Sequence, residues 1–125
     1  MRRQQFVKLQ ELTGLLHRSG VLLLAGTDTP VQFCPPGSAI NQELELLVQS
    51  GLTPAAALTA ATLKVARAIN RTAELGSIET GKLADLVLLD ANPLEDIRNT
   101  RKIFRVIRSG VVCVPSTLLG AVPAK

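Results

Sequence analysis

The sequence is poor in the residue types that build base-binding, redox and membrane-spanning structures. Its 125 residues include three Phe, no Trp and no Tyr, which makes a poor stacking surface for nucleic-acid bases. The two cysteines, Cys34 and Cys113, lie far apart without metal-ligand spacing. They fit reduced thiols in the cytoplasm, and a disulfide between them is the alternative. Since no apolar run approaches the ~20 residues of a membrane-spanning helix, we expect a cytoplasmic protein with no membrane partner.

What the chain has is aliphatic material and a positive charge. Hydrophobic residues make up 46% and charged residues 19%, which argues against disorder and predicts a core of Leu, Val, Ile and Ala. The net charge is +4, and the densest basic stretch runs over residues 98–108 with acids nearby. A solvated face explains that stretch better than nucleic-acid binding, which is the weaker alternative, so we expect no nucleic-acid partner.

The first half of the chain predicts helices around one buried strand. Apolar residues at three- and four-residue spacing predict a helix over 2–18. Residues 21–25 form a continuous apolar run, which predicts a strand buried on both faces as in parallel sheets. A loop over 26–37 precedes a helix from Ser38 to about Gln49. Thr53-Pro54 predicts the start of a further helix, which continues or breaks near Thr62.

The second half predicts short strands. Residues 75–82 suit a small strand with a tight turn, residues 84–90 a second strand, and residues 103–114 a hairpin turning at Ser109-Gly110. The tail from Pro115 is expected to fray. The order predicts an α/β protein made of one βα unit and a small β piece. A single βα unit cannot bury both faces of its strand, so the predicted core is incomplete.

One carboxylate stands where chemistry is expected. Asp28 follows the predicted strand 21–25, and active sites of parallel α/β proteins gather at the carboxyl ends of strands. In that place Asp28 could bind a divalent metal or take a proton from a metal-bound water. The local pattern leaves open that Asp28 only caps or turns the loop.

Several short segments stand in a specific order from about Leu15 to Val114. They are Leu24-Ala25-Gly26-Thr27-Asp28, residues 43–48, Gly51-Leu52-Thr53-Pro54, Ala60-Ala61-Thr62, Leu75-Gly76-Ser77-Ile78, the stretch Gly81 to Asp90, and Asn92 to Ile97 before a Val-Ile-x-x-Gly hairpin. This series resembles the C-terminal end of the amidohydrolase family, especially its imidazolonepropionase-like and prolidase-like members.

The resemblance implies a fold and a chemistry. It implies a C-terminal fragment of a (β/α)₈ barrel over residues 1–72, strands of a small composite β-sandwich over 73–115, and a flexible tail over 116–125. Asp28 corresponds to an aspartate that contacts the metal and shuttles a proton while a metal-activated water hydrolyses a carbon–nitrogen bond. The implied cofactor is zinc or another divalent metal, and the implied substrate is a small amide or cyclic amide. Asp85 and Asp90 fall in a structural signature of the small sheet.

The sequence departs from the family pattern at the metal site. Asn41 stands where many relatives carry a histidine, and its amide could bind substrate but could not act as an acid or base. The family's His-x-His pair and further ligands are absent here, and the lone His17 lies in the opening helix. Cys34 is expected to be inert. We therefore expect the isolated chain to be inactive unless another polypeptide supplies the barrel. The alternative is a non-enzymatic, self-associating module.

Overall fold

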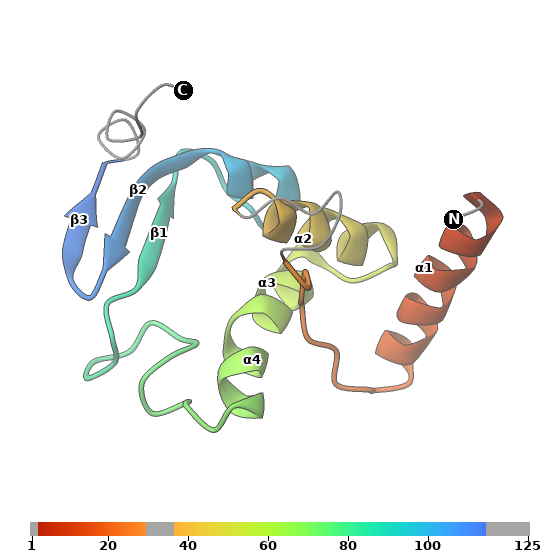
Figure 1. Ribbon diagram of the computed structural model, residues 1–125, viewed down its shortest axis with the longest axis horizontal. Coiled ribbons are helices and arrows are strands. Elements are labelled where there is room, and N and C mark those ends of the chain that lie inside the picture. Colours follow the sequence, from red (N-terminus) through yellow and green to blue (C-terminus); the bar gives the residue numbers. More distant parts are fainter. Residues whose placement is uncertain (1–2, 30–36, 115–125) are drawn as a thin grey trace.

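A computed structural model describes residues 3–29 and 37–114 of the chain. Within them, helices occupy the N-terminal part and a three-stranded sheet the C-terminal part (Figure 1). The elements are α1 (Arg3–Arg18), α2 (Ala39–Gln49), α3 (Pro54–Ala61), α4 (Leu63–Ala68), β1 (Leu86–Leu89), the 3₁₀ helix η1 (Ile97–Arg101), β2 (Ile103–Arg108) and β3 (Val111–Cys113). This mixture of helices and strands places the chain in the α/β class.

Local signals fix the boundaries of α3 and α4. The Thr53 side chain accepts a hydrogen bond of 3.1 Å from the amide of Ala56, and Pro54 fills the first turn, as predicted for a helix start. At Thr62 the backbone leaves the helical region, with φ −126° and ψ −90°. The hydroxyl of Thr62 donates to the carbonyl of Leu58 at 2.8 Å. Of the two alternatives that the sequence leaves open near Thr62, continuation and a break, the structure shows the break.

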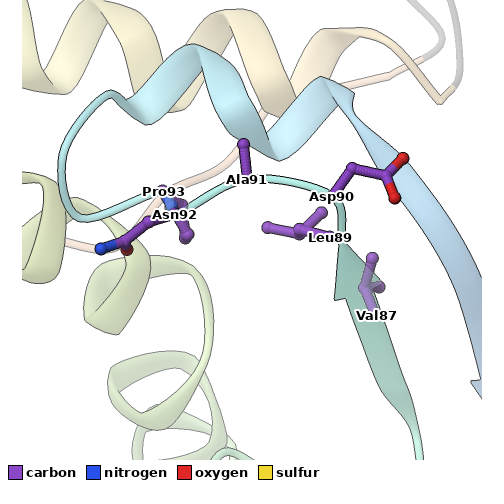
Figure 2. A pocket seen from close by; sticks show the side chains of 6 residues that line it. All are labelled: Val87, Leu89, Asp90, Ala91, Asn92 and Pro93. Atoms are coloured by element: carbon purple, nitrogen blue, oxygen red, sulfur yellow. The ribbon is translucent and has the colours of Figure 1, made fainter.

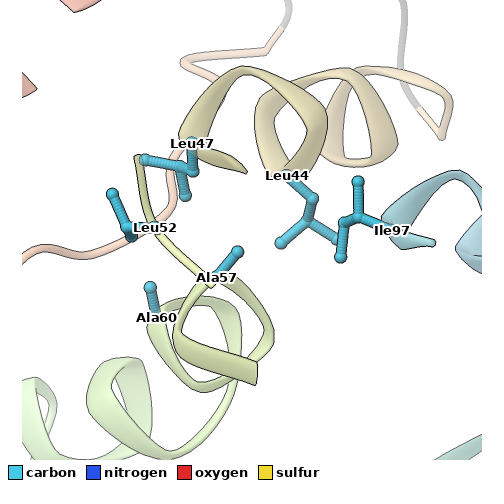
Figure 3. Packing of buried hydrophobic residues seen from close by; sticks show 6 residues of the cluster. All are labelled: Leu44, Leu47, Leu52, Ala57, Ala60 and Ile97. Atoms are coloured by element: carbon cyan, nitrogen blue, oxygen red, sulfur yellow. The ribbon is translucent and has the colours of Figure 1, made fainter. Parts of the chain in front are cut away.

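The core lies where α2, α3 and η1 meet. Its buried members are aliphatic and come from these elements and the α2–α3 connection: Leu44, Leu47, Leu52, Ala57, Ala60 and Ile97 (Figure 3). Figure 3 shows the side chains of Leu44 and Ile97 pointing toward each other across the α2–η1 contact. Partly buried residues pack around this cluster, among them Leu23 and Ala25 of the segment after α1. The segment that precedes Asp28 is thereby fastened to the core.

The sheet is an antiparallel meander in the order β1-β2-β3. Leu86 faces Ile107 and Val87 faces Val106, and the register shifts between Leu88 and Leu89. At the turn, Ser109 and Gly110 adopt φ values of 49° and 80°, which gives the tight hairpin turn that the Ser-Gly pair predicts.

The hairpin tip is tied to the residues just before β1. The amide of Ser109 donates to Oδ1 of Asp85 at 2.7 Å, and the amide of Gly110 donates to the carbonyl of Ala84 at 3.1 Å. Asp85 therefore has the structural role that the sequence predicts for it.

Two predicted strands are wrong. Residues 21–25 run without a strand partner in the described part of the chain, and Val21, Leu22 and Leu24 are exposed and not buried. The apolar run predicted burial on both faces, but burial of a strand requires neighbours that these residues do not have here. Residues 75–82 form turns instead of a small strand.

The predicted tail 116–125 lies outside the described residues, as does Cys34. No helix in the described ranges is long and apolar enough to cross a membrane.

Candidate functional site

Asp28 lies three residues after a fixed point on the core. The amide of Ala25 donates to the carbonyl of Ala60 at 3.1 Å, so the segment is held against the end of α3. Beyond it, the hydroxyls of Thr27 and Thr29 share a hydrogen bond of 2.9 Å across Asp28. Asp28 itself has φ 51°, a left-handed conformation that Asp adopts more readily than most residues, and it is exposed. The chain therefore turns sharply at Asp28, directly after an anchored segment, with this residue accessible.

Asn41 lies in the first turn of α2 and is half-buried. The predicted cap of this helix, Ser38, stands at the N-cap position but makes no side-chain capping bond. Among the residues that the structure describes, no hydrogen bond joins Asn41 to Asp28. The two residues are thus placed at the beginnings of a loop and of a helix, and their cooperation on a substrate stays a prediction.

The described residues do not fit a resident metal ion by themselves. No group of three or more His, Cys, Asp or Glu side chains within residues 3–29 and 37–114 is arranged to hold one. A catalytic zinc needs about three protein ligands and a water, and Asp28 supplies one carboxylate. His17 is half-buried at the end of α1, where a cationic or polar ring suits the negative end of the helix dipole. A metal centre that includes Asp28 needs ligands from beyond the described residues.

A second polar cluster, missed in the sequence, fastens the turn after α4. Nζ of Lys82 donates to Oγ of Ser77 at 2.5 Å, and that hydroxyl donates to Oε1 of Glu79 at 2.6 Å. Hydrogen bonding from Ser77 and the charge of Lys82, 3.4 Å from Glu79, lower the pKa of the Glu79 carboxyl. In the sequence, this cluster could have been found from the short spacing of Ser77, Glu79 and Lys82 around Gly81. The ammonium is already paired with a carboxylate, so the cluster stabilises the loop.

A shallow hollow follows β1 and lies apart from Asp28 along the chain. It is lined by Val87, Leu89, Asp90, Ala91, Asn92 and Pro93 (Figure 2). Figure 2 shows the side chains of Asp90 and Asn92 pointing in opposite directions. Oδ1 of Asn92 accepts from the amide of Leu94 at 3.0 Å, which makes a turn at this point of the chain. These polar groups do not converge on one point, and we assign no chemistry to the hollow.

The basic stretch over residues 98–108 is largely engaged within the fold. Arg98 pairs with Asp96, with Nη2 and Oδ2 2.6 Å apart, and Nε of Arg101 lies 2.7 Å from Oε1 of Glu45 on α2. The guanidinium of Arg105 lies 4.1 Å from the ring centroid of Phe104. This arrangement agrees with a solvated, ion-paired face.

Comparison with known proteins gives the class. Residues 7–113 match the model of the amidohydrolase family, and the chain belongs to this family.

Two relatives with similar sequences are imidazolonepropionases. The chain is 34% identical over 103 residues to the imidazolonepropionase of Brevibacillus brevis (strain 47 / JCM 6285 / NBRC 100599), covering 76% of this chain and 23% of the relative. It is 53% identical over 62 residues to the imidazolonepropionase of Geobacillus sp. (strain WCH70), covering 46% of this chain and 15% of the relative.

Among solved structures, a Xaa-Pro dipeptidase with bound methionine in the active site aligns with a TM-score of 0.77 and 32% identity, over 84% of this chain and 25% of that one. Phenylurea hydrolase B aligns with a TM-score of 0.76 and 34% identity, over 90% and 28% of the two chains. The chain thus spans between 15% and 28% of the length of these four proteins.

Proposed function

We propose that this chain forms the C-terminal part of an amidohydrolase that hydrolyses carbon–nitrogen bonds in small amides. The observation that carries the proposal is the family match over residues 7–113, which includes Asp28 and the segment that anchors it. The names of the relatives support two substrate groups. The Xaa-Pro dipeptidase supports Xaa-Pro dipeptides, and imidazolonepropionase supports cyclic amides. In this proposal residues 1–72 are the last βα portion of a barrel and residues 73–115 are strands of a composite β-sandwich.

Asp28 is the proposed catalytic residue. An accessible carboxylate immediately after an anchored segment is held in a defined place, and such a group can accept a proton and return it during amide cleavage. Asn41 is proposed to contact substrate through its amide. The family's divalent metal, zinc or another ion, needs ligands from other polypeptide segments, because the residues described here do not form a complete site. We therefore propose that the isolated chain is inactive.

A chimera tests the assignment of Asp28. The chain replaces the aligned quarter of the Xaa-Pro dipeptidase, and hydrolysis of a Xaa-Pro dipeptide is measured. We expect the chimera to be active and Asp28→Asn to lower kcat/KM by at least ~100-fold, the usual contribution of a proton-transferring group. Asp90→Asn is the matched control, because Asp90 joins the fold through its backbone amide, which donates to the carbonyl of Lys102 at 2.8 Å. Equal activities of the two variants would remove Asp28 from the proposal.

The isolated chain gives a separate test of inactivity. Purified protein is assayed with Xaa-Pro dipeptide and with a cyclic amide, with and without added zinc, beside Asp28→Asn. No turnover above that of the variant is expected. Stoichiometric, tightly held metal together with turnover by the unmodified chain would overturn the claim.

A second candidate is a non-enzymatic module that associates with copies of itself. The exposed apolar side chains of Leu22 and Leu24 favour this alternative, since bare apolar surface promotes association. Size-exclusion chromatography with light scattering, which measures the oligomeric state of the isolated chain, decides between this module and the amidohydrolase part proposed above. A monomer over the accessible concentration range would exclude the self-associating module.

A further inference from the structure

Asp28 stands between two threonines whose side chains contact each other. The hydroxyls of Thr27 and Thr29 share a hydrogen bond of 2.9 Å, and both residues are half-buried while Asp28 between them is exposed. Two residues of extended chain advance about 6.6 Å, so two short side chains whose hydroxyls lie this close fit a tighter backbone at the residue between them. The bond therefore spans the turn at Asp28 on its less exposed side.

The backbone of Asp28 has a conformation that needs such support. Its φ of 51° is left-handed, a region that residues with a Cβ enter at a cost. Threonine suits the supporting role, because its β-branched side chain has few accessible χ1 rotamers and loses little freedom when its hydroxyl is bound. Before the turn, the amide of Ala25 is held by the carbonyl of Ala60 at 3.1 Å. Asp28 is thus held by a backbone contact to the core and by a side-chain bridge across its own turn.

We propose that Thr27 and Thr29 are positioning residues, whose hydroxyl bridge fixes the left-handed turn that holds the Asp28 carboxylate in its working place. The proposal rests on the proposed function of Asp28 and adds the residues that hold it. In this role the two hydroxyls act through the backbone of Asp28 and not on the substrate. A displacement of about 1 Å can lower the rate of a catalysed step ~100-fold, so loss of the bridge should be felt in kcat.

The activity of the dipeptidase chimera tests this role. Thr29→Val keeps the shape of the side chain and removes the hydroxyl. It should lower kcat for a Xaa-Pro dipeptide by ~10–100-fold with KM unchanged, the split expected when only the transition state is affected. Thr29→Ser keeps the hydroxyl and should restore most of kcat. Thr13→Val is the matched control, because the hydroxyl of Thr13 bonds to the carbonyl of Leu9 within α1 at 2.9 Å.

Two combinations of variants show whether the hydroxyls act as a pair and through Asp28. Because both hydroxyls serve one bond, Thr27→Val/Thr29→Val should be no slower than the slower single variant. In the Asp28→Asn background, Thr29→Val should cause no further loss, since the residue that it positions no longer exchanges a proton. Losses that multiply in either combination would overturn the bridge as a positioning device.

The isolated chain gives a readout that needs no activity. A positive φ brings the amide proton and the Hα of one residue close together, so Asp28 should give a strong cross-peak between them in NMR spectra. The cross-peak should weaken in Thr29→Val and persist in Thr29→Ser and Thr13→Val. An inactive chimera together with this pattern would defeat the proposed function while supporting the bridge. A cross-peak of equal strength in the unmodified chain and in Thr29→Val would overturn the positioning role, whatever the activity of the chimera.

Discussion

Asp96 shows how a single half-buried carboxylate organises the chain before β2. It stands at the N-cap of η1, where Oδ1 accepts from the amide of Arg98 at 2.9 Å. The guanidinium of Arg98 also donates to the carboxylate, with Nη2 2.6 Å from Oδ2. The hydrogen bonds from the Arg98 side chain and amide lower the pKa of Asp96 from 3.8 to about 2. The ionised form is thus favoured in the folded state, and η1, which carries the core residue Ile97, begins at a defined residue.

This pKa predicts a pH dependence with a definite sign. Because the folded pKa lies below the unfolded value of ~3.9, the contribution of Asp96 to stability is complete above about pH 4 and is lost as the pH falls toward 2. Asp96→Asn and Arg98→Gln should each flatten the fall in Tm over that window, measured by thermal unfolding at a series of pH values. The effect should be modest, since Arg98 is 73% exposed and water screens the pair. Slopes equal to that of the unmodified chain would contradict the assignment.

At the scale of elements, α1 is attached through a crossing that requires glycine. Gly14 is the buried residue of α1, and a Cβ at this position would lie 2.2 Å from the carbonyl oxygen of Ser50, at the end of α2. One side-chain bond supports the crossing, from Nε2 of Gln10 to Oε1 of Gln49 at 3.3 Å. The exposed apolar face of α1 shows that little else holds it within the described residues.

Gly14→Ala should release α1 from α2 while leaving α1 helical. Alanine favours the helix by about 1 kcal/mol over glycine, but its methyl group cannot fit against the carbonyl of Ser50. Amide exchange in residues 46–51 and proteolysis within residues 19–29 should both become faster, with helix content by circular dichroism unchanged or higher. Thr13→Ala is the control, because the Thr13 hydroxyl bonds back to its own helix at Leu9. Unchanged exchange in Gly14→Ala would mean that α1 docks in another way.

Elements governed by local rules could be predicted, and those that depend on distant partners could not. Thr53-Pro54 and Ser109-Gly110 were predicted correctly because a cap and a tight turn are decided by adjacent residues. The run 21–25 looked like a buried strand because its composition is that of one, but pairing is a property of neighbours. The same holds for the site: the position of Asp28 after an extended apolar segment follows from the sequence, whereas the described residues contain no group of side chains that could hold a metal ion with it.

As a whole molecule, the chain exposes more surface than its mass requires. Its accessible area is 9136 Å², whereas a compact monomer of 13.3 kDa exposes roughly 6,500 Å². The core cluster has few buried members, and no large side chain of the described residues is completely shielded from solvent. Because stability comes chiefly from apolar burial, the isolated chain should be marginally stable.

The isolated chain should therefore bind a hydrophobic dye in its native state and unfold with weak cooperativity. Calorimetry should give a broad transition at or below the ~45–65 °C range of ordinary domains. The chimera with the Xaa-Pro dipeptidase should bind less dye per chain and unfold more sharply, because the bare faces become covered. A sharp transition of the free chain above that range, with no dye bound, would show a complete fold.

The tie between Asp85 and the hairpin tip has a consequence for the order of folding. The bond from the Ser109 amide to Asp85 closes a loop of chain over a 24-residue separation, and the bond from the Gly110 amide to the carbonyl of Ala84 lies just outside it. A hairpin forms in ~1–10 μs, and contacts of short sequence separation form before distant ones. A one-residue slip would break both bonds and turn every strand side chain to the opposite face. The meander should thus reach its single register early, before α1 and residues 21–25 pack against the rest of the chain.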